Sequence, residues 1–168
     1  MGALTVTGEP DDPVPDEPAE AVRALVARVV EALELDASVE VSESDEEIRA
    51  TVEGDELGLL IGKHGTTIDA LQHVAMRAAY RGGPETRKQV VVDAAGYRER
   101  RASALHRAAE QAVADAISFG RPVELEPMRP PERKIVHNYL SERTEVETHS
   151  EGDEPDRRLV VTPVRAPG

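Results

Sequence analysis

The sequence contains no cysteine, and its aromatic residues are limited to three tyrosines and one phenylalanine. The absence of cysteine excludes disulfide bonds, thiolate metal sites and cysteine nucleophiles. The scarcity of aromatics argues against a surface on which nucleic-acid bases stack, as in RRM and OB domains. No apolar run approaches the ~20 residues of a membrane helix, and the N-terminus lacks the basic and apolar regions of a signal peptide. These absences predict a soluble, cytoplasmic protein without membrane insertion.

Charge is distributed unevenly along the 168 residues, whose net charge is −13. Residues 1–56 contain 17 acidic and 3 basic residues, and residues 145–168 contain 6 acidic and 3 basic ones. Residues 57–144 contain 10 acidic and 14 basic residues, so the middle of the chain is basic. Salt screens charges that are more than about 8 Å apart, so the local sign matters more than the total. A polyanionic ligand is therefore compatible with the middle segment.

The first 95 residues have the pattern of a small mixed domain behind a tail. Residues 1–15 are acidic and rich in proline, which predicts a disordered tail. A helix is expected from Asp16, which suits the N-cap, through Pro18 in the first turn, to near Leu35. Its apolar positions recur at helical spacing: Val22, Leu25, Val26, Val29, Val30 and Leu33.

The remainder of this domain, residues 16–95, alternates between strands and helices. Thr66, followed by Asp69, resembles a capping box that starts a helix, and Gly82-Gly83-Pro84 ends it. Its buried face is expected to contain Ile68, Leu71, Ala75, Ala78 and Ala79. The other expected elements are strands at 39–42, 48–53 and 89–92 and a short helix at 56–61. The order α-β-β-α-α-β predicts an α+β fold.

Residues 96–168 predict a second, small α/β domain. A long helix is expected from about Tyr97 to Phe119, and a second helix is expected to begin at Pro130-Pro131. Short strands are expected at 123–125, 147–150 and 159–162. The residues expected to face the core are Leu105, Ala108, Ala109, Ala112, Val113, Ala116, Ile117, Ile135, Val136, Tyr139 and Leu140.

The first candidate binding element is the loop Gly62-Lys63-His64-Gly65 between two expected helices. Glycine at both ends allows a tight turn and close approach of a ligand to the backbone. Free N–H groups at the start of the next helix favour phosphate, and Lys63 adds a positive charge. The alternative is a plain corner between two helices. A nucleotide-hydrolase loop is excluded because Gly58 to His64 is one residue short of a Walker loop and lacks its Ser/Thr.

The segment around this loop, Leu57 to Gln72 (LGLLIGKHGTTIDALQ), resembles the KH domain of the bacterial Jag family, also called KhpB or EloR. The preceding strands match the type II KH order. KH loops clamp about four nucleotides of a single strand. The resemblance implies that bases lie toward the strand of Ile48, Ala50 and Val52, and that His64 stands where the family often has arginine. The implied RNA-binding residues are Gly62, Lys63, His64, Gly65 and Thr66.

The second candidate element is Arg133-Lys134-Ile135-Val136-His137. Residues i and i+4 share a helix face, so Arg133 and His137 are expected to project together while Ile135 and Val136 pack behind them. Arginine supplies a permanent charge and a planar set of donors, and histidine supplies another donor. The alternative is an exposed arginine beside a half-buried histidine that caps the helix.

The segment from Pro127 to His137 (PMRPPERKIVH) resembles the R-x3-H signature of the same family, and Ser150 to Arg158 resembles its C-terminal segment. The resemblance covers about residues 20–164. It implies that Arg129, Arg133, Lys134 and His137 bind polynucleotide phosphates. Many members carry a further N-terminal domain on a long linker, where this sequence has a short acidic tail.

Other chemistry-bearing residues indicate no catalytic or metal site. His73, His106 and His149 lack ligand spacing and are expected at the surface or in packing. The remaining basic residues of the long helix are either solvated or in contact with phosphate: Arg98, Arg100, Arg101 and Arg107.

The sequence predicts a binding protein without enzymatic activity or cofactor. Its ligand is single-stranded RNA, with single-stranded DNA as a second candidate. The resemblance implies a post-transcriptional regulator or RNA chaperone connected with cell elongation and cell-wall control. The alternative is a scaffold that pairs with a second KH protein of the KhpA type and binds RNA only incidentally.

Overall fold

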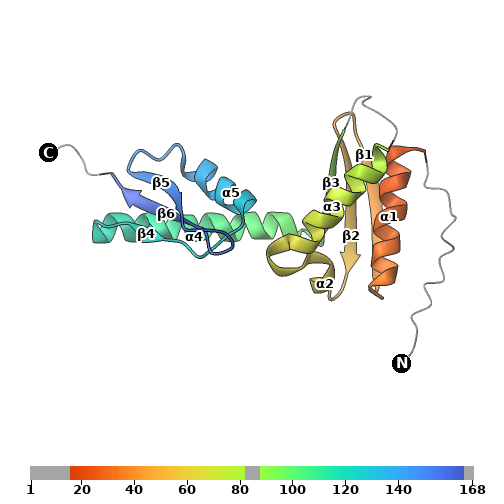
Figure 1. The fold of residues 1–168 in the computed structure, drawn as a ribbon, viewed down its shortest axis with the longest axis horizontal. Helices are drawn as coiled ribbons and strands as arrows, with labels where there is room; N and C mark the ends of the chain where they lie inside the picture. The colour runs from red at the N-terminus through yellow and green to blue at the C-terminus, as the bar shows by residue number, and fades with distance from the viewer. Residues whose placement is uncertain (1–15, 82–87, 165–168) are drawn as a thin grey trace. The chain divides into compact units, whose positions relative to one another are not determined.

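The computed structural model describes residues 16–81 and 88–164, so the expected tail at 1–15 and the helix stop at 82–84 lie outside its described part (Figure 1). The chain divides into two compact units, residues 1–97 and residues 98–168. Each unit has a three-stranded sheet and a hydrophobic core of its own. The predicted α+β class is confirmed.

The first unit follows the predicted order of elements. They are α1 (Pro18–Ala32), β1 (Ala37–Glu43), β2 (Glu47–Gly54), α2 (Gly58–Ile61), a 3-10 turn (Lys63–Gly65), α3 (Thr66–Ala79) and β3 (Gln89–Ala94). The sheet order is β1-β2-β3, with β1 antiparallel and β3 parallel to β2. The antiparallel register places Val39 opposite Val52. The central strand is therefore β2, whose end leads through α2 into the loop.

The core of the first unit lies between the helices and one face of the sheet. Helices α1 and α3 pack against each other and against the strands. Ile48, Ala50 and Val52 are 0% exposed, as their alternation with polar residues predicts. Full burial of an aliphatic side chain contributes roughly 1.5–3 kcal/mol. This packing provides a rigid support for the loop.

Both ends of α1 differ from the prediction. The N-cap is Glu17, not Asp16, and it makes no side-chain cap hydrogen bond. The helix starts where Pro18 occupies the first helical position, whose N–H needs no partner. It ends at Ala32 rather than near Leu35 because Glu34 adopts a φ of 53°. The Leu35 N–H then donates to the Val30 carbonyl at 3.1 Å, the bond of a Schellman motif.

The second unit packs two helices on a small antiparallel sheet. Its elements are α4 (Tyr97–Phe119, which starts at the end of the first unit), β4 (Val123–Glu124), α5 (Pro130–Leu140), β5 (Val146–Glu151) and β6 (Arg158–Pro163). The sheet order is β4-β6-β5, so β5 is an edge strand. The core includes Leu105, Ala109, Ala112, Val113, Ala116, Val136, Leu140, Val146, Leu159 and Val161.

Four residues predicted to face this core are exposed instead. Ala108 and Ile117 lie on the outer side of α4, and Ile135 and Tyr139 lie on the outer side of α5. The buried stripe of α5 follows the i, i+4 rows through Glu132, Val136 and Leu140, so it is narrower than predicted. Tyr139 packs at the surface, where its ring stacks on His106 with centroids 4.0 Å apart.

A surface network connects α4 to the segment after α5. The Tyr139 hydroxyl donates to Glu110 at 2.8 Å, and the Arg143 guanidinium donates to Glu110 and, at 3.2 Å, to Glu145. The Tyr139 hydrogen bond and then Arg143 hold the pKa of Glu110 below its usual 4.5. Glu145 also has a lowered pKa, through its own backbone N–H and then Arg143.

We expect the free energy of unfolding of Glu110→Gln to change less with pH in the acid range than that of wild type. A carboxylate whose pKa is lowered in the folded protein adds stability. This stability is fully present at a pH above the ordinary pKa, and it is lost as the pH falls through the pKa of the folded state. Urea unfolding of wild type and variant at pH 7 and at about pH 3.5 measures this difference. The stability difference between the two proteins should be larger at pH 7, and an equal difference at both pH values would contradict the network.

Candidate nucleic-acid interface

The Gly62–Gly65 loop is a tight turn between α2 and α3. Gly62 has φ 73° and ψ 174°, and His64 and Gly65 also have positive φ, of 53° and 78°. The Gly62 N–H donates to the Gly58 carbonyl at 2.9 Å, and the Gly65 N–H donates to the Gly62 carbonyl at 3.2 Å. The backbone is therefore fixed by local hydrogen bonds before any ligand binds.

Both glycines are required by close neighbours as well as by φ. A Cβ at Gly62 would lie 2.2 Å from Thr67 Oγ1 and 2.8 Å from the Thr67 backbone nitrogen. A Cβ at Gly65 would lie 2.8 Å from the Tyr97 ring. Tyr97 thus supports the loop from behind, a role that was not predicted from the sequence because it follows Gly65 by more than thirty residues.

The predicted capping box at Thr66 and Asp69 is wrong. Gly65 is the N-cap of α3, in the left-handed conformation and with no side chain to offer. Thr66 already has helical angles, and its hydroxyl donates to the Lys63 carbonyl at 3.0 Å. Thr66 therefore closes the turn, while the Lys63 and His64 side chains are exposed to solvent. Two cationic or donor groups beside a helix N-terminus can hold a phosphate.

The side chains of Ile48, Ala50 and Val52 cannot contact bases. All three are 0% exposed, because they face α1 and α3 in the core. The expectation that bases lie toward this strand therefore finds no support in these side chains.

In the second unit, Arg133 is held by the protein itself. Its side chain is only 11% exposed. One terminal nitrogen donates to the Met128 carbonyl at 2.8 Å, and the other donates to Glu154 at 2.7 Å in the turn between β5 and β6. This guanidinium connects the start of α5 to that turn and already has a carboxylate partner, so it is not a free donor for phosphate.

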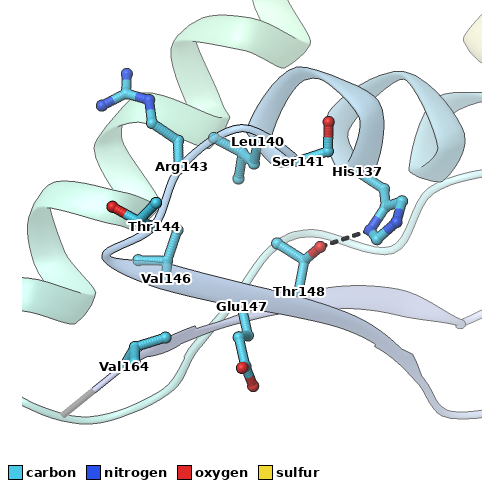
Figure 2. A pocket seen from close by; sticks show the side chains of 9 residues that line it. All are labelled: His137, Leu140, Ser141, Arg143, Thr144, Val146, Glu147, Thr148 and Val164. Atoms are coloured by element: carbon cyan, nitrogen blue, oxygen red, sulfur yellow. Dashed lines mark hydrogen bonds between the residues drawn. The ribbon is translucent and has the colours of Figure 1, made fainter. Parts of the chain in front are cut away.

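His137 and Lys134 are the more accessible groups of this element. Both are exposed, and His137 Nδ1 lies 2.6 Å from Thr148 Oγ1 on β5 (Figure 2). Lys134 has no ion pair within residues 16–81 and 88–164. The His137 imidazole is thus oriented by β5, with its second nitrogen available on the other side of the ring.

Arg133, Lys134 and His137 line one pocket of about 350 Å³ between α5 and β5, whereas Arg129 does not line it. The pocket also contains Thr148, His149 and Ser150 of β5, which were not predicted as site residues. The sequence contains a signal for two of them. Side chains two residues apart in a strand point to the same face, so Thr148 and Ser150 lie on the face of the buried Val146, toward the helices. The pocket combines cationic side chains with hydroxyl groups, a suitable environment for phosphate.

Arg101 and Arg129 take part in the packing of α5. Glu132 is 5% exposed and accepts hydrogen bonds from Arg101 Nε at 2.6 Å and from the Arg129 backbone N–H at 3.0 Å. Arg101 therefore neutralises a buried carboxylate, and this structural role accounts for its position on the long helix.

Within the described ranges, no group of three or more His, Asp or Glu residues could hold a metal ion, and no helix is long and apolar enough to cross a membrane.

Comparison with known domain families assigns each unit. Residues 19–92 match the KH domain of KhpA/KhpB, and residues 103–163 match the R-x3-H domain. The first match contains the Gly62–Gly65 loop, and the second contains the α5–β5 pocket. The chain is therefore a protein with a KH domain followed by an R-x3-H domain.

Curated relatives resemble most of the chain. The RNA-binding protein KhpB of Clostridium symbiosum is 36% identical over 128 residues, which is 76% of this chain and 57% of the relative. The protein of the same name from Lactiplantibacillus plantarum is 40% identical over 144 residues, 84% and 44% of the two chains. That of Bacillus subtilis is 32% identical over 148 residues, 87% and 71%. The chain belongs to the KhpB, or Jag, family, and it spans about half the length of the first two relatives.

Proposed function

We propose that this chain binds single-stranded RNA through its phosphate backbone. It does so without a platform of aromatic side chains on which bases stack. The observation that carries the proposal is the geometry of the loop at Lys63 and His64. Its two glycines can be replaced by no other residue without strain, and its two middle side chains are exposed to solvent, where a phosphate can approach them. The names of the relatives, RNA-binding protein KhpB, support RNA as the ligand.

The R-x3-H unit would supply a second contact to the strand. Lys134 and His137 would bind phosphate directly, while Arg133 would mainly hold the pocket in shape through Met128 and Glu154. The protein would act as a binding protein and not as an enzyme, in the cytoplasm. Its cellular role would be that of a post-transcriptional regulator or RNA chaperone connected with cell elongation and cell-wall control, which the family resemblance suggests.

Filter binding to a single-stranded RNA at several salt concentrations tests the proposal. We expect saturable binding whose log affinity falls with log salt with a slope of about −2 to −3, because each phosphate contact on a single strand contributes about −0.7. Single-stranded DNA of the same sequence serves as the competitor. No saturable binding at moderate salt would contradict the proposal.

A scaffold that pairs with a second KH protein is the other candidate. The observation in its favour is that α3 exposes Met76, at 39%, beside a hollow of about 270 Å³ that His73, Arg77 and Tyr80 also line. Residues three and four apart share a helix face, so this face of α3 offers a partly apolar surface to a protein partner. The two candidates are distinguished by Met76→Lys: loss of a KH-protein partner without loss of RNA affinity would favour the scaffold.

If both units hold one strand, Lys134→Ala with His137→Ala should weaken binding of long RNA much more than that of short RNA. Linkage of two contacts raises the effective concentration of the second, and a short oligonucleotide cannot use both. Anisotropy titrations with RNAs of different length measure the effect, with Lys134→Arg as the charge-conserving control. Equal losses for every length would argue against bivalent binding.

A further inference from the structure

A second hollow adjoins the pocket at Lys134 and His137. It lies between the end of α5, the segment 141–145 and β5, and its volume is about 590 Å³ (Figure 2). The two hollows share His137 and Thr148, whose side chains are joined by the 2.6 Å hydrogen bond. They are therefore neighbouring parts of one groove along α5 and β5.

The chemistry of this second hollow differs from that of the first. Leu140 and Val146, which are 2% and 4% exposed, lie at its base, and Val164, which is 44% exposed, supplies most of its aliphatic surface. Arg143 and Glu147 also line the hollow, and Figure 2 shows their side chains extending to opposite sides of it. Arg143 is held by Glu110 and Glu145. Between these two charges the lining consists of aliphatic groups, the hydroxyls of Ser141 and Thr144, and the His137 ring.

The edge strand adds backbone groups to the same groove. The Val164 N–H donates to the Glu145 carbonyl at 2.9 Å, which makes residues 145 and 164 a hydrogen-bonded pair. In an antiparallel ladder such pairs alternate, so Glu147 and His149 also bond toward β6. The N–H and C=O groups of Val146 and Thr148 therefore point away from β6, toward the open edge. These groups can donate to and accept from the edge of a flat polar ring.

We propose that the hollow beside Thr144 receives a nucleobase of the RNA strand whose phosphate is held at Lys134 and His137. A hollow that offers aliphatic groups and hydroxyls, next to a cationic pocket, matches the division of a nucleotide into a flat base with a polar edge and an anionic phosphate. It also lets a protein with few aromatics bury a base without a stacking platform. The inference rests on the proposed RNA binding and adds a base contact to the phosphate contacts.

The test compares RNA with abasic RNA of the same length, whose phosphates and sugars are retained. Thr144→Phe fills the hollow without changing charge at an exposed position, and Ser118→Phe places the same side chain at an exposed position of α4 outside it. Wild type should prefer intact RNA. In Thr144→Phe this preference should fall about tenfold, because loss of one buried base contact corresponds to about 1.4 kcal/mol. Ser118→Phe should retain the full preference.

The outcomes separate this inference from the proposed function. If wild type binds no RNA, both fail. If wild type binds RNA but Thr144→Phe weakens intact and abasic RNA equally, or weakens neither, the hollow receives no base and RNA binding itself stands. Ser141→Phe, which fills the same hollow from its other rim, provides a second variant should Thr144→Phe be unstable.

Discussion

Replacing Lys63 and His64 by aspartate is expected to weaken single-stranded RNA binding by more than about a hundredfold, because two hydrogen bonds to charged groups, each contributing roughly 1.5–3 kcal/mol, are lost. The two carboxylates would in addition face phosphate. Both side chains are exposed, so the free energy of unfolding should change little. His64 has φ 53°, and aspartate tolerates this left-handed conformation better than most residues. Anisotropy titration with labelled RNA and urea unfolding measure the two quantities.

A matched control separates the effect of charge in the loop from the effect of the net charge of the protein. Arg28→Asp with Arg77→Asp reverses two exposed arginines on α1 and α3 and shifts the net charge at least as far as the loop variant does. Salt screens charges outside the binding site, so the control should lose much less affinity. A folded loop variant with unchanged affinity, or equal losses in both variants, would mean that the loop is only a corner between two helices.

Gly62→Ala should destabilise the first unit by about 3 kcal/mol and also abolish most RNA binding. Its φ and ψ lie in a region that is open essentially to glycine alone, at a cost of roughly 1–3 kcal/mol for other residues. The added Cβ would also lie within 3 Å of the Thr67 backbone nitrogen, which cannot move without disturbing the start of α3. Denaturant unfolding followed by circular dichroism measures the loss.

Gly58→Ala is the control for this substitution. Gly58 lies four residues earlier at the start of α2, and a Cβ there meets nothing within 4 Å. Alanine in a helix is favoured over glycine by roughly 0.5–1 kcal/mol, so this variant should be at least as stable as wild type. Equal stability of Gly62→Ala and Gly58→Ala would show that the loop tolerates other backbone conformations.

The order of elements in both units could be predicted from the sequence because the hydrophobic period changes clearly along the chain. The alternation of Ile48, Ala50 and Val52 identified a strand whose side chains are indeed buried. Helix ends were harder, because they depend on single residues in unusual conformations. Glu34 ends α1 with a positive φ that glycine or asparagine would normally signal, and Gly65 caps α3 without a side chain.

The candidate site could be predicted in part. The loop was found because glycines, charge and flanking helices lie together in the sequence. The sequence could not predict that the Arg133 guanidinium is already paired with a carboxylate. Its partner Glu154 is 21 residues away and is brought to it by the turn between β5 and β6. The hydrogen bond between His137 and Thr148 depends in the same way on how α5 lies on β5.

Residue-resolved NMR titration of the full chain with a single-stranded RNA tests the central claim most directly. We predict saturable shifts of the backbone amides of residues 62–66 and of residues 134–148, with the first set lost in the Lys63→Asp, His64→Asp variant. The backbone amides of Glu40 and Glu43, the exposed acidic residues of β1, should not shift. Shifts confined to other surfaces, or no saturation at moderate salt, would contradict the account.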